Sequence, residues 1–400
     1  MANAYTDTSA TSFGGTVGGA GLVQKAYDRL LEFALRSEPL IRSVADKRPA
    51  KQAIPGSTVV LQKYVDLDAK TSTLTETVDP DAVALSTPTS VTVTLNEYGN
   101  AVLVTRALEL FSLADVDPAI ANIIAYNLAD SIDNVAMTTL RSGTNNIYAG
   151  NATAVANVDA ADTLDSADIR KAVAKLRSNK AKGRRGNAYW VGIHPEVSHD
   201  LRAETGDLGW RYPQSQSASE ASKIWAGEIG EYEGAFFVES SRLYNAKSGA
   251  DQTALTTTAV TVAGVSAAFT FGVASSSVIA SRAEAGDGIA GTGIASGAKI
   301  TAISTSGSTT TITVDTANTA AVTATTVVTV TPVTRVFDTI VAGSQAMAEA
   351  VAEEPHVVIG NVTDKLMRFR PMGWYGVLGF SVYRDEALYR ITSGSSIAAL

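Results

Sequence analysis

The residue types that most often carry chemistry are scarce in this chain. It contains no cysteine, and its three histidines are His194, His199 and His356. The lack of cysteine excludes a thiolate nucleophile, a disulfide framework and a zinc finger. His194 and His199 are five positions apart, whereas two histidines that bind one zinc ion from a helix face need a spacing of four. Pro195 lies between them, so we interpret one as a strand-end residue and the other as a helix-surface residue.

The glycine-rich segments do not match a phosphate-binding loop. Gly288, Gly291 and Gly293 lack the G-x-G-x-x-G spacing, and no Gly-Lys-Ser/Thr follows them. No helix is predicted after them to present its N-terminal amides, so turns between strands are favoured. The chain also has no G-x-S-x-G nucleophile elbow. We therefore expect no enzyme activity and no catalytic, cofactor-binding or metal-binding residue.

Basic residues are concentrated in one short stretch. Such a cluster can contact phosphate or an acidic surface. It can also be a solvated helix end, where cations complement the helix dipole, and the sequence favours this second interpretation. An acidic patch of Glu349, Glu353 and Glu354 is interpreted as forming surface ion pairs. The basic cluster consists of Lys175, Arg177, Lys180, Lys182, Arg184 and Arg185.

Composition narrows the possible classes of protein. The 400 residues include 32 Lys and Arg and 40 Asp and Glu, giving a net charge of −8. This balance argues against a dedicated nucleic-acid binder, which usually has a basic footprint. The hydrophobic content of 45% can form substantial cores, and the length favours two or three domains. The first residues do not resemble a signal peptide, and no apolar run is long enough to span a membrane, so we expect neither element.

The first hundred residues predict an arm, a helix and a long hairpin. Residues 1–20 are small, polar and rich in glycine, which is typical of a flexible arm, and a helix is expected at 21–36. Apolar and polar residues alternate at 57–67 and 91–95, as in strands. The polar stretch 68–90 between them predicts a mobile tip. Because an isolated hairpin is marginal in water, we expect something outside the chain to pack against it.

The clearest predicted helix covers residues 118–142. Pro118 suits the first helical position, Asp117 can cap the helix, and Gly143 can end it. A helix of this length extends roughly 37 Å, which is more than a small core needs. Its apolar stripe consists of Ile120, Ile123, Ile124, Leu128, Ile132, Val135, Ala136 and Leu140.

The rest of the chain predicts a mixed α+β body with one unusual region. Residues 250–334 contain only six charged residues, and threonine and valine alternate there in short runs, so we interpret them as a small inserted all-β domain. Low complexity is the alternative interpretation. In the body, helices are predicted at 166–181 and 195–203, strands at 189–193, 235–239, 355–359, 374–383 and 387–391, and a helix or turn at 346–348.

Three sequence segments outside this region, taken in their order along the chain, resemble a known family. They resemble the major capsid proteins of tailed bacteriophages, specifically the N4 gp56-like family with the HK97-type fold. The family pattern normally runs without the stretch that is inserted here. The segments are Gly192-Ile193-His194-Pro195-Glu196-Val197 through Leu201, Gly227-Glu228-Ile229-Gly230-Glu231-Tyr232-Glu233-Gly234 with Phe237-Val238-Glu239, and Gly373-Trp374-Tyr375-Gly376 through Ile391.

The resemblance implies an α+β HK97-type capsid fold. Its parts would be an N-terminal arm, an extended β-hairpin loop, a long spine helix and a mixed axial domain, with a small inserted all-β domain that is Ig-like or a β-sandwich. The implied boundaries are 1–40 for the arm and helix, 41–105 for the extended loop and flanking strands, 106–163 for the peripheral domain with the spine helix, 164–250 for the first axial part, 251–334 for the insert and 335–400 for the second axial and peripheral part.

The resemblance also implies a function by self-assembly. The subunit would form hexamers and pentamers of an icosahedral shell around packaged double-stranded phage DNA, with the insert projecting outward. Portal, scaffolding or decoration proteins would be partners, while no cofactor and no membrane are expected. The protein would be made in the bacterial host cytoplasm and end in the virion. Candidate interface residues are Tyr64, Asp66, Lys70, Glu76, Tyr98, Arg106, Trp210, Tyr212 and Trp225.

Two other classes remain open from the sequence. An extracellular or surface adhesion protein would explain the β insert, but the missing signal peptide argues against it. An enzyme with an unrecognised carboxylate site is the second alternative. The tryptophans named above as interface anchors could equally be core residues.

Overall fold

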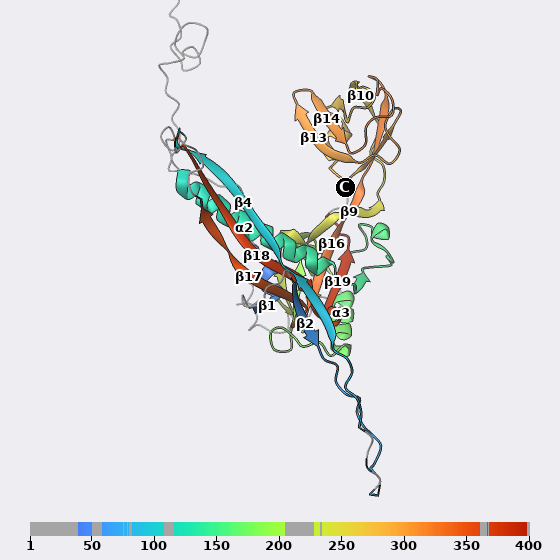
Figure 1. Cartoon of the computed structure of the whole chain (residues 1–400). Helices are drawn as coiled ribbons and strands as arrows, with labels where there is room; N and C mark the ends of the chain where they lie inside the picture. Colours follow the sequence, from blue (N-terminus) through green and yellow to red (C-terminus); the bar gives the residue numbers. More distant parts are fainter. Residues whose placement is uncertain are drawn as a thin grey trace, which may run out of the picture. The chain divides into compact units, whose positions relative to one another are not determined.

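The computed structural model, drawn in Figure 1, describes most of the chain, and the described residues belong to two compact units. Unit 1 consists of residues within 98–129 and 355–376, and unit 2 of residues within 39–97, 130–354 and 377–397. The predicted arm and the predicted helix at 21–36 lie outside the described residues. The structure describes residues 39–49, 58–74, 76–77, 79, 82–107, 116–204, 228–232, 234–360, 366 and 368–397.

A seven-stranded mixed sheet is the centre of unit 2. Its strand order is β5-β19-β16-β6-β8-β7, and β9 also pairs with β16. The pairs β5–β19 and β6–β8 are parallel, whereas β16 is antiparallel to each of its partners. The strands are β5 (Asn146–Tyr148), β6 (Tyr189–Ile193), β7 (Glu228–Tyr232), β8 (Ala235–Glu239), β9 (Tyr244–Asp251), β16 (Val333–Ala342) and β19 (Leu388–Ser393).

Two capped helices border this sheet, and both confirm predictions. Helix α3 (Ser166–Ser178) begins after Asp165, whose carboxylate accepts a hydrogen bond from the Asp168 N–H at 2.9 Å. Helix α4 (Pro195–Ala203) begins with proline at its first position, as predicted. The predicted apolar face of α3 is buried in the core shared with β6, β8 and β16. That face consists of Ile169, Ala172, Val173 and Leu176.

A second sheet of four strands has the order β1-β17-β18-β4. A helix or turn was the prediction for residues 346–348, but only Ala346 lies in a bend, and strand β17 begins at Met347. Met347 and the residues after it pair in parallel with β1, starting at Ala45. This non-local pairing outweighs the helix preference of a short alanine-rich run. The strands are β1 (Ala45–Pro49), β4 (Asn96–Thr105), β17 (Met347–Ile359) and β18 (Phe369–Val382).

The long predicted helix is present as α2 (Val116–Arg141), but it begins two residues before the predicted start, so Asp117 and Pro118 lie inside its first turn and not at the cap and the first position. It contributes Ile124 to the core of unit 1 and Ala136 and Leu140 to a core of unit 2. Within the described part of the chain, no helix is both long and apolar enough to cross a membrane. The 3-10 helices are η1 (Ile41–Val44), η2 (Val155–Asn157), η4 (Ser241–Leu243) and η5 (Asp385–Ala387).

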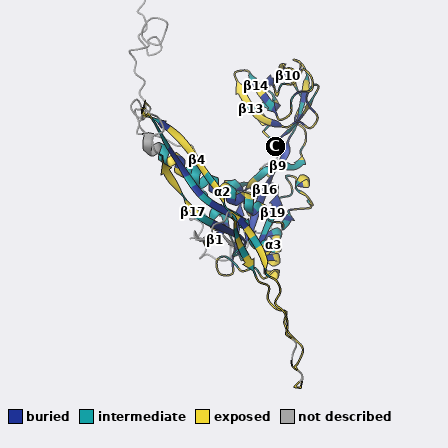
Figure 2. Ribbon diagram, viewed as in Figure 1, coloured by how far each residue is buried: buried dark blue, intermediate teal, exposed yellow. Residues whose placement is uncertain are grey.

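The predicted hairpin is present, but its first strand is shorter than the alternation indicated. Strands β2 (Thr58–Lys63) and β3 (Thr89–Thr94) pair antiparallel, with Thr58 opposite Thr94 and Lys63 opposite Thr89. Residues 64–67 continue the alternating pattern without a pairing partner, so they lie outside the ladder. The connection between the two strands is exposed throughout its described residues except Pro88 (yellow in Figure 2).

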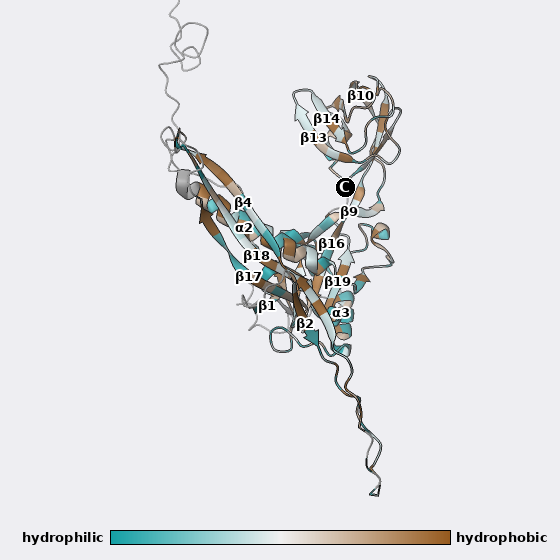
Figure 3. Ribbon diagram, viewed as in Figure 1, coloured by the Kyte–Doolittle hydropathy of each residue, from teal (hydrophilic) through white to brown (hydrophobic). Residues whose placement is uncertain are grey.

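Residues 255–331, called here the six-stranded region, form a sheet and a hydrophobic core of their own. The strand order is β12-β15-β10-β11-β14-β13, and its core includes Phe271, Ile289, Ile312 and Val330. Figure 3 colours β13 and β14 mostly pale, since threonine and serine dominate them. The elements are β10 (Thr258–Val262), β11 (Thr270–Ala274), α6 (Val278–Arg282), β12 (Gly288–Gly291), β13 (Ile300–Ser306), β14 (Thr309–Val314) and β15 (Val327–Thr331).

Candidate assembly interface

The connection between β2 and β3 exposes an unusual amount of apolar surface. Seven large hydrophobic side chains in this connection and in β2 are more than half exposed, up to 78% for Leu85. Soluble monomers rarely expose contiguous apolar surface of this kind unless it is a binding site. The side chains are Val60, Tyr64, Val65, Leu67, Leu74, Val83 and Leu85.

The base of the same hairpin is anchored to unit 2. The Lys63 ammonium lies 2.8 Å from a carboxylate oxygen of Glu386, and the Tyr383 hydroxyl donates to the Gln62 carbonyl at 3.4 Å. The hydrogen bond from Lys63 lowers the pKa of Glu386. The exposed connection therefore begins at a fixed point of the subunit.

Four of the predicted interface residues belong to this connection. Tyr64, Asp66, Lys70 and Glu76 are all exposed. The Tyr64 hydroxyl donates to the side-chain oxygen of Gln62, two residues away, at 3.2 Å. The structure thus brings these four residues onto one solvated segment. The predicted residues Trp210, Tyr212 and Trp225 lie outside the described residues.

The other two predicted interface residues belong to unit 1. Tyr98 is half-buried and packs against the core of Val104, Ile124, Met372 and Trp374, so it contributes to the fold of its own subunit. Arg106 is exposed, and its backbone N–H donates to the Arg368 carbonyl at 2.9 Å.

Unit 1 also contains an apolar hollow that the sequence did not indicate. Its volume is about 330 Å³. Glycine is required in its wall, because a Cβ on Gly373 would lie 2.5 Å from the Asn100 carbonyl oxygen. Next to the hollow, Ile359 is 58% exposed. It ends a run of three branched residues, and this run is the sequence feature that could have indicated the hollow. The lining residues are Gly99, Asn100, Ala101, Val358, Gly360, Pro371, Gly373 and Trp374.

The histidines have structural positions, as the sequence indicated. His194 precedes α4 and accepts a hydrogen bond from the Glu196 N–H at 3.3 Å through Nδ1, and its ring lies 4.7 Å from that of Phe337. Burial lowers the pKa of His194 to about 4. His199 is exposed on the helix surface. Among the described residues, no group of three or more His, Asp or Glu side chains could hold a metal ion.

The lowered pKa of His194 makes stability depend on pH. In the unfolded chain this histidine has a pKa of about 6.5. Between pH 6.5 and 4 the unfolded state therefore binds more protons than the folded state, and the stability of the folded state decreases as the pH is lowered. Since the ring is partly solvated, we expect a loss of about 1–2 kcal/mol across this range. His194→Asn retains a capping oxygen without a titrating group. The melting temperature of this variant relative to wild type should therefore increase as pH falls.

Two controls isolate this effect. Asp168 has the opposite sign, because burial and the neighbouring Asp165 raise its pKa to about 6, so the wild-type profile alone is a sum of opposing contributions. His199→Asn makes the same change at a histidine of α4 whose side chain is 61% exposed, and it shows what a histidine-to-asparagine substitution does to stability without the burial of His194. A His194→Asn difference that does not change with pH would contradict the assignment.

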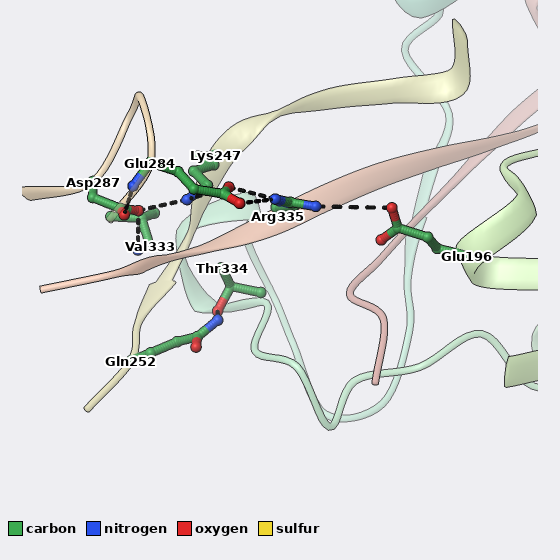
Figure 4. Close-up of polar contacts among 8 residues, drawn as sticks. All are labelled: Glu196, Lys247, Gln252, Glu284, Asp287, Val333, Thr334 and Arg335. Carbon is green, nitrogen blue, oxygen red and sulfur yellow. Dashed lines mark hydrogen bonds and ion pairs between the residues drawn. The ribbon is translucent and has the colours of Figure 1, made fainter. Parts of the chain in front are cut away.

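A cluster of charged side chains connects the six-stranded region to β9 and β16 (Figure 4). The Lys247 ammonium lies 2.7 Å from the Asp287 carboxylate and 2.9 Å from that of Glu284. Arg335 pairs with Glu284 and lies 3.8 Å from Glu196. Burial alone would raise the pKa of Glu284, but the hydrogen bonds from Arg335 and Lys247 lower it.

Backbone groups complete this junction. Asp287, which is fully buried, also accepts hydrogen bonds from the N–H groups of Glu284 at 2.8 Å and Val333 at 3.2 Å. Its carboxylate is thus bonded by Lys247 of β9 and by Val333 of β16, the two strands that flank the six-stranded region in the sequence. The scarcity of charge in this region is visible in the sequence, but the meeting of two of its few charged residues at one junction is not.

Comparison with known proteins agrees with the shell interpretation. A family model for phage capsid protein matches residues 88–300, which is more than half of the chain. No match was found among curated proteins.

Solved phage capsid structures have a similar fold. The Cyanophage Pam1 capsid asymmetric unit gives a TM-score of 0.58 at 12% identity, covering 99% of this chain and 100% of that one. The capsid of Ralstonia phage GP4 gives 0.58 at 12% identity, with coverage of 94% and 96%. A chain of Mycobacterium phage Che8 gives 0.53 at 15% identity, with coverage of 92% and 97%.

These similarities support a mixed, strand-rich capsid fold, and the match to the family model shows the family of the chain. The chain belongs to the phage capsid protein family and is a major capsid protein that forms the shell.

Proposed function

We propose that this subunit has the HK97-type fold of the N4 gp56-like family and forms hexamers and pentamers that close an icosahedral shell around packaged phage DNA. The observation that supports this proposal is the exposed apolar connection between β2 and β3. It emerges at Lys63, which is held by its ion pair with Glu386. A neighbouring subunit would cover these side chains. Head-to-tail contacts of this type close into rings when the rotation between subunits permits it.

The proposed fold would have the boundaries expected from the resemblance. Residues 1–40 would form the arm, 41–105 the extended loop and its flanking strands, and 106–163 the peripheral domain with α2 as the spine. Residues 164–250 and 335–400 form the axial domain and the remainder of the peripheral domain. The uninterrupted length of α2 and the mixed sheet of unit 2 support this division.

The six-stranded region would project outward as an inserted domain, with boundaries 251–334. Its sheet and core draw on its own residues, which supports a region that folds apart from the body of the subunit. Threonine-rich strands give it a polar surface suited to solvent or to decoration proteins. Portal and scaffolding proteins would contact the shell elsewhere, and the subunit would be made in the bacterial host cytoplasm before it enters the virion.

Removing the six-stranded region tests this proposal. Asp251 and Val333 are register partners in the β9–β16 pair, so a two-residue turn can replace residues 252–332. We expect sedimentation and negative-stain microscopy to find large uniform particles for the purified wild-type chain and for the shortened chain. A wild-type chain that remains monomeric would contradict the shell function. A shortened chain that folds but does not assemble would place the region in an interface.

A further inference from the structure

An open, basic hollow lies where α3 ends and the chain turns toward β6. Its volume is about 490 Å³. Arg177, Lys180 and Lys182 line it, all three are exposed, and none forms an ion pair with a described residue. Residues 169–195 contain eight Lys and Arg and no Asp or Glu. The hollow is therefore a concentrated positive site without a partner of its own among the described residues.

The backbone at the end of α3 holds Lys180 in an unusual conformation. The Lys180 N–H donates to the Arg177 carbonyl and the Ala181 N–H donates to the Leu176 carbonyl, each at 3.0 Å. This is the hydrogen-bond pattern of a Schellman motif, whose left-handed position is usually glycine. Lys180 occupies that position with φ of 57°. A lysine at a position that favours glycine costs conformational energy, which points to a use for its ammonium group.

The loop that carries these cations is pre-organised. The Tyr189 hydroxyl donates to the Ala181 carbonyl at 2.8 Å, and the Ser344 N–H donates to the Lys182 carbonyl at 2.8 Å. Gly186, with φ of 61°, provides the turn that returns the chain to β6. A ligand can therefore bind without first ordering this backbone, which reduces the entropic cost of binding.

The chain itself carries a complementary segment. Residues 64–88 have a net charge of −4. Asp66, Asp68, Glu76 and Asp79 are exposed there, and none pairs with a cation among the described residues. Both halves of a charge-complementary contact are thus present and unpaired in one subunit, which is what a head-to-tail contact between copies requires.

We propose that the basic hollow of Arg177, Lys180 and Lys182 binds the acidic segment 64–88 of a neighbouring copy of this chain. The inference rests on the proposed assembly and adds the receiving site for the carboxylates of the loop. Carboxylates are favoured over nucleic-acid phosphates because the hollow is small and local, whereas binding along a nucleic-acid backbone is typically carried by a basic patch or stripe. The neighbouring copy also supplies the segment at high local concentration once a ring begins to form.

Charge reversal in three full-length variants tests this contact. Lys180→Glu with Lys182→Glu reverses the hollow, and Asp66→Lys, Asp68→Lys, Glu76→Lys and Asp79→Lys together reverse the segment. Each variant is expected to reduce particle yield by about tenfold or more, because like charges then face each other in every contact. The chain that carries both sets of changes should recover particles, since every contact again joins opposite charges.

A matched variant is the control for these particle yields. Arg282→Glu with Lys299→Glu reverses two exposed cations of the six-stranded region and should assemble as wild type does. The proposal is overturned if the hollow-reversed chain assembles normally or if the combined chain does not recover. It is also overturned if the hollow-reversed particles form normally but retain less DNA, which would assign the hollow to phosphate. If wild type forms no particles, the proposed assembly fails as well.

Lys180→Gly separates folding from assembly most clearly. Glycine relieves the left-handed position, so the melting temperature should stay the same or increase. Particle yield should nevertheless fall, because one cation of the hollow is lost. A Lys180→Gly chain that assembles as well as wild type would contradict a role for Lys180 in binding the neighbouring segment.

Discussion

Replacing residues 64–88 with an Asn-Gly turn is expected to leave a folded subunit that no longer builds closed particles. Lys63 and Thr89 are register partners at the end of the β2–β3 ladder, and a two-residue Asn-Gly turn joins antiparallel strands at such a pair. Every described residue from 64 to 87 is exposed, so its removal takes no core from the subunit. The melting temperature should therefore change little.

The loss of assembly should be large because the deleted segment carries most of the exposed apolar side chains of the hairpin. Full burial of one such side chain is worth about 1.5–3 kcal/mol. Even after the costs of association and ordering, several kcal/mol per contact would be lost. We expect particle counts by electron microscopy to fall by about a hundredfold or more, since 1.4 kcal/mol corresponds to tenfold in an equilibrium constant.

A matched turn replacement provides the control. Gly307 and Ser308 form the two-residue connection between β13 and β14, with Ser306 opposite Thr309. Changing this connection to Asn-Gly alters a turn of the same length outside the proposed interface, and shells should form as in wild type. Normal shells from the chain that lacks residues 64–88 would show that this segment is not an assembly element.

Lys247→Met is expected to lower the free energy of unfolding by about 3 kcal/mol or more. The Lys247 side chain is 5% exposed and that of Asp287 is fully buried. Removing one member of a buried ion pair leaves an uncompensated charge, which typically costs about 3–5 kcal/mol. The two backbone donors to Asp287 offset only part of this loss. Denaturant titration measures the change, and limited proteolysis should cut within the six-stranded region sooner.

Two variants show whether burial is the cause. Lys47→Met removes a lysine paired with Glu354 at 3.4 Å, and both side chains are 59% exposed, so it should cost at most about 1 kcal/mol. Adding Asp287→Asn to Lys247→Met removes the orphaned charge and keeps one acceptor oxygen, which can serve one of the two backbone donors, so it should recover part of the loss. A cost for Lys247→Met no larger than that for Lys47→Met would contradict the role of the junction.

Local signals explain the elements that the sequence predicted correctly. Helix α4 starts at Pro195 after a capping residue, and α3 has its apolar residues on one face, so both are encoded over a few residues. The hairpin strands follow from alternation in the same way. These features required no knowledge of distant partners.

The features that the sequence did not predict have a common physical cause, which is pairing between distant parts of the chain. Met347 enters a strand because β1, some three hundred residues away, supplies the neighbouring ladder. Tyr64 to Leu67 alternate like a strand but lack a partner, so the ladder stops at Lys63. Nothing local distinguishes Lys247 from a surface lysine, since Asp287 lies forty residues further on.

The candidate interface also combines features that could be predicted from local sequence with features that could not. Tyr64 and Asp66 could be predicted as exposed because they adjoin a polar tip, whereas the packing of Tyr98 against the core of unit 1 could not be predicted. The apolar hollow beside Gly373 depends on a close backbone approach, which composition does not reveal. The basic cluster was visible in the sequence, but the conformation of Lys180 was not.

The most direct test of the assembly account is a near-atomic electron microscopy map of particles formed by the wild-type chain. We expect closed shells in which residues 64–88 are ordered against a neighbouring subunit, with Leu67, Leu74 and Leu85 covered by it. A stable monomer would contradict the account. Closed shells in which this segment remains exposed to solvent and touches no neighbour would contradict its central claim.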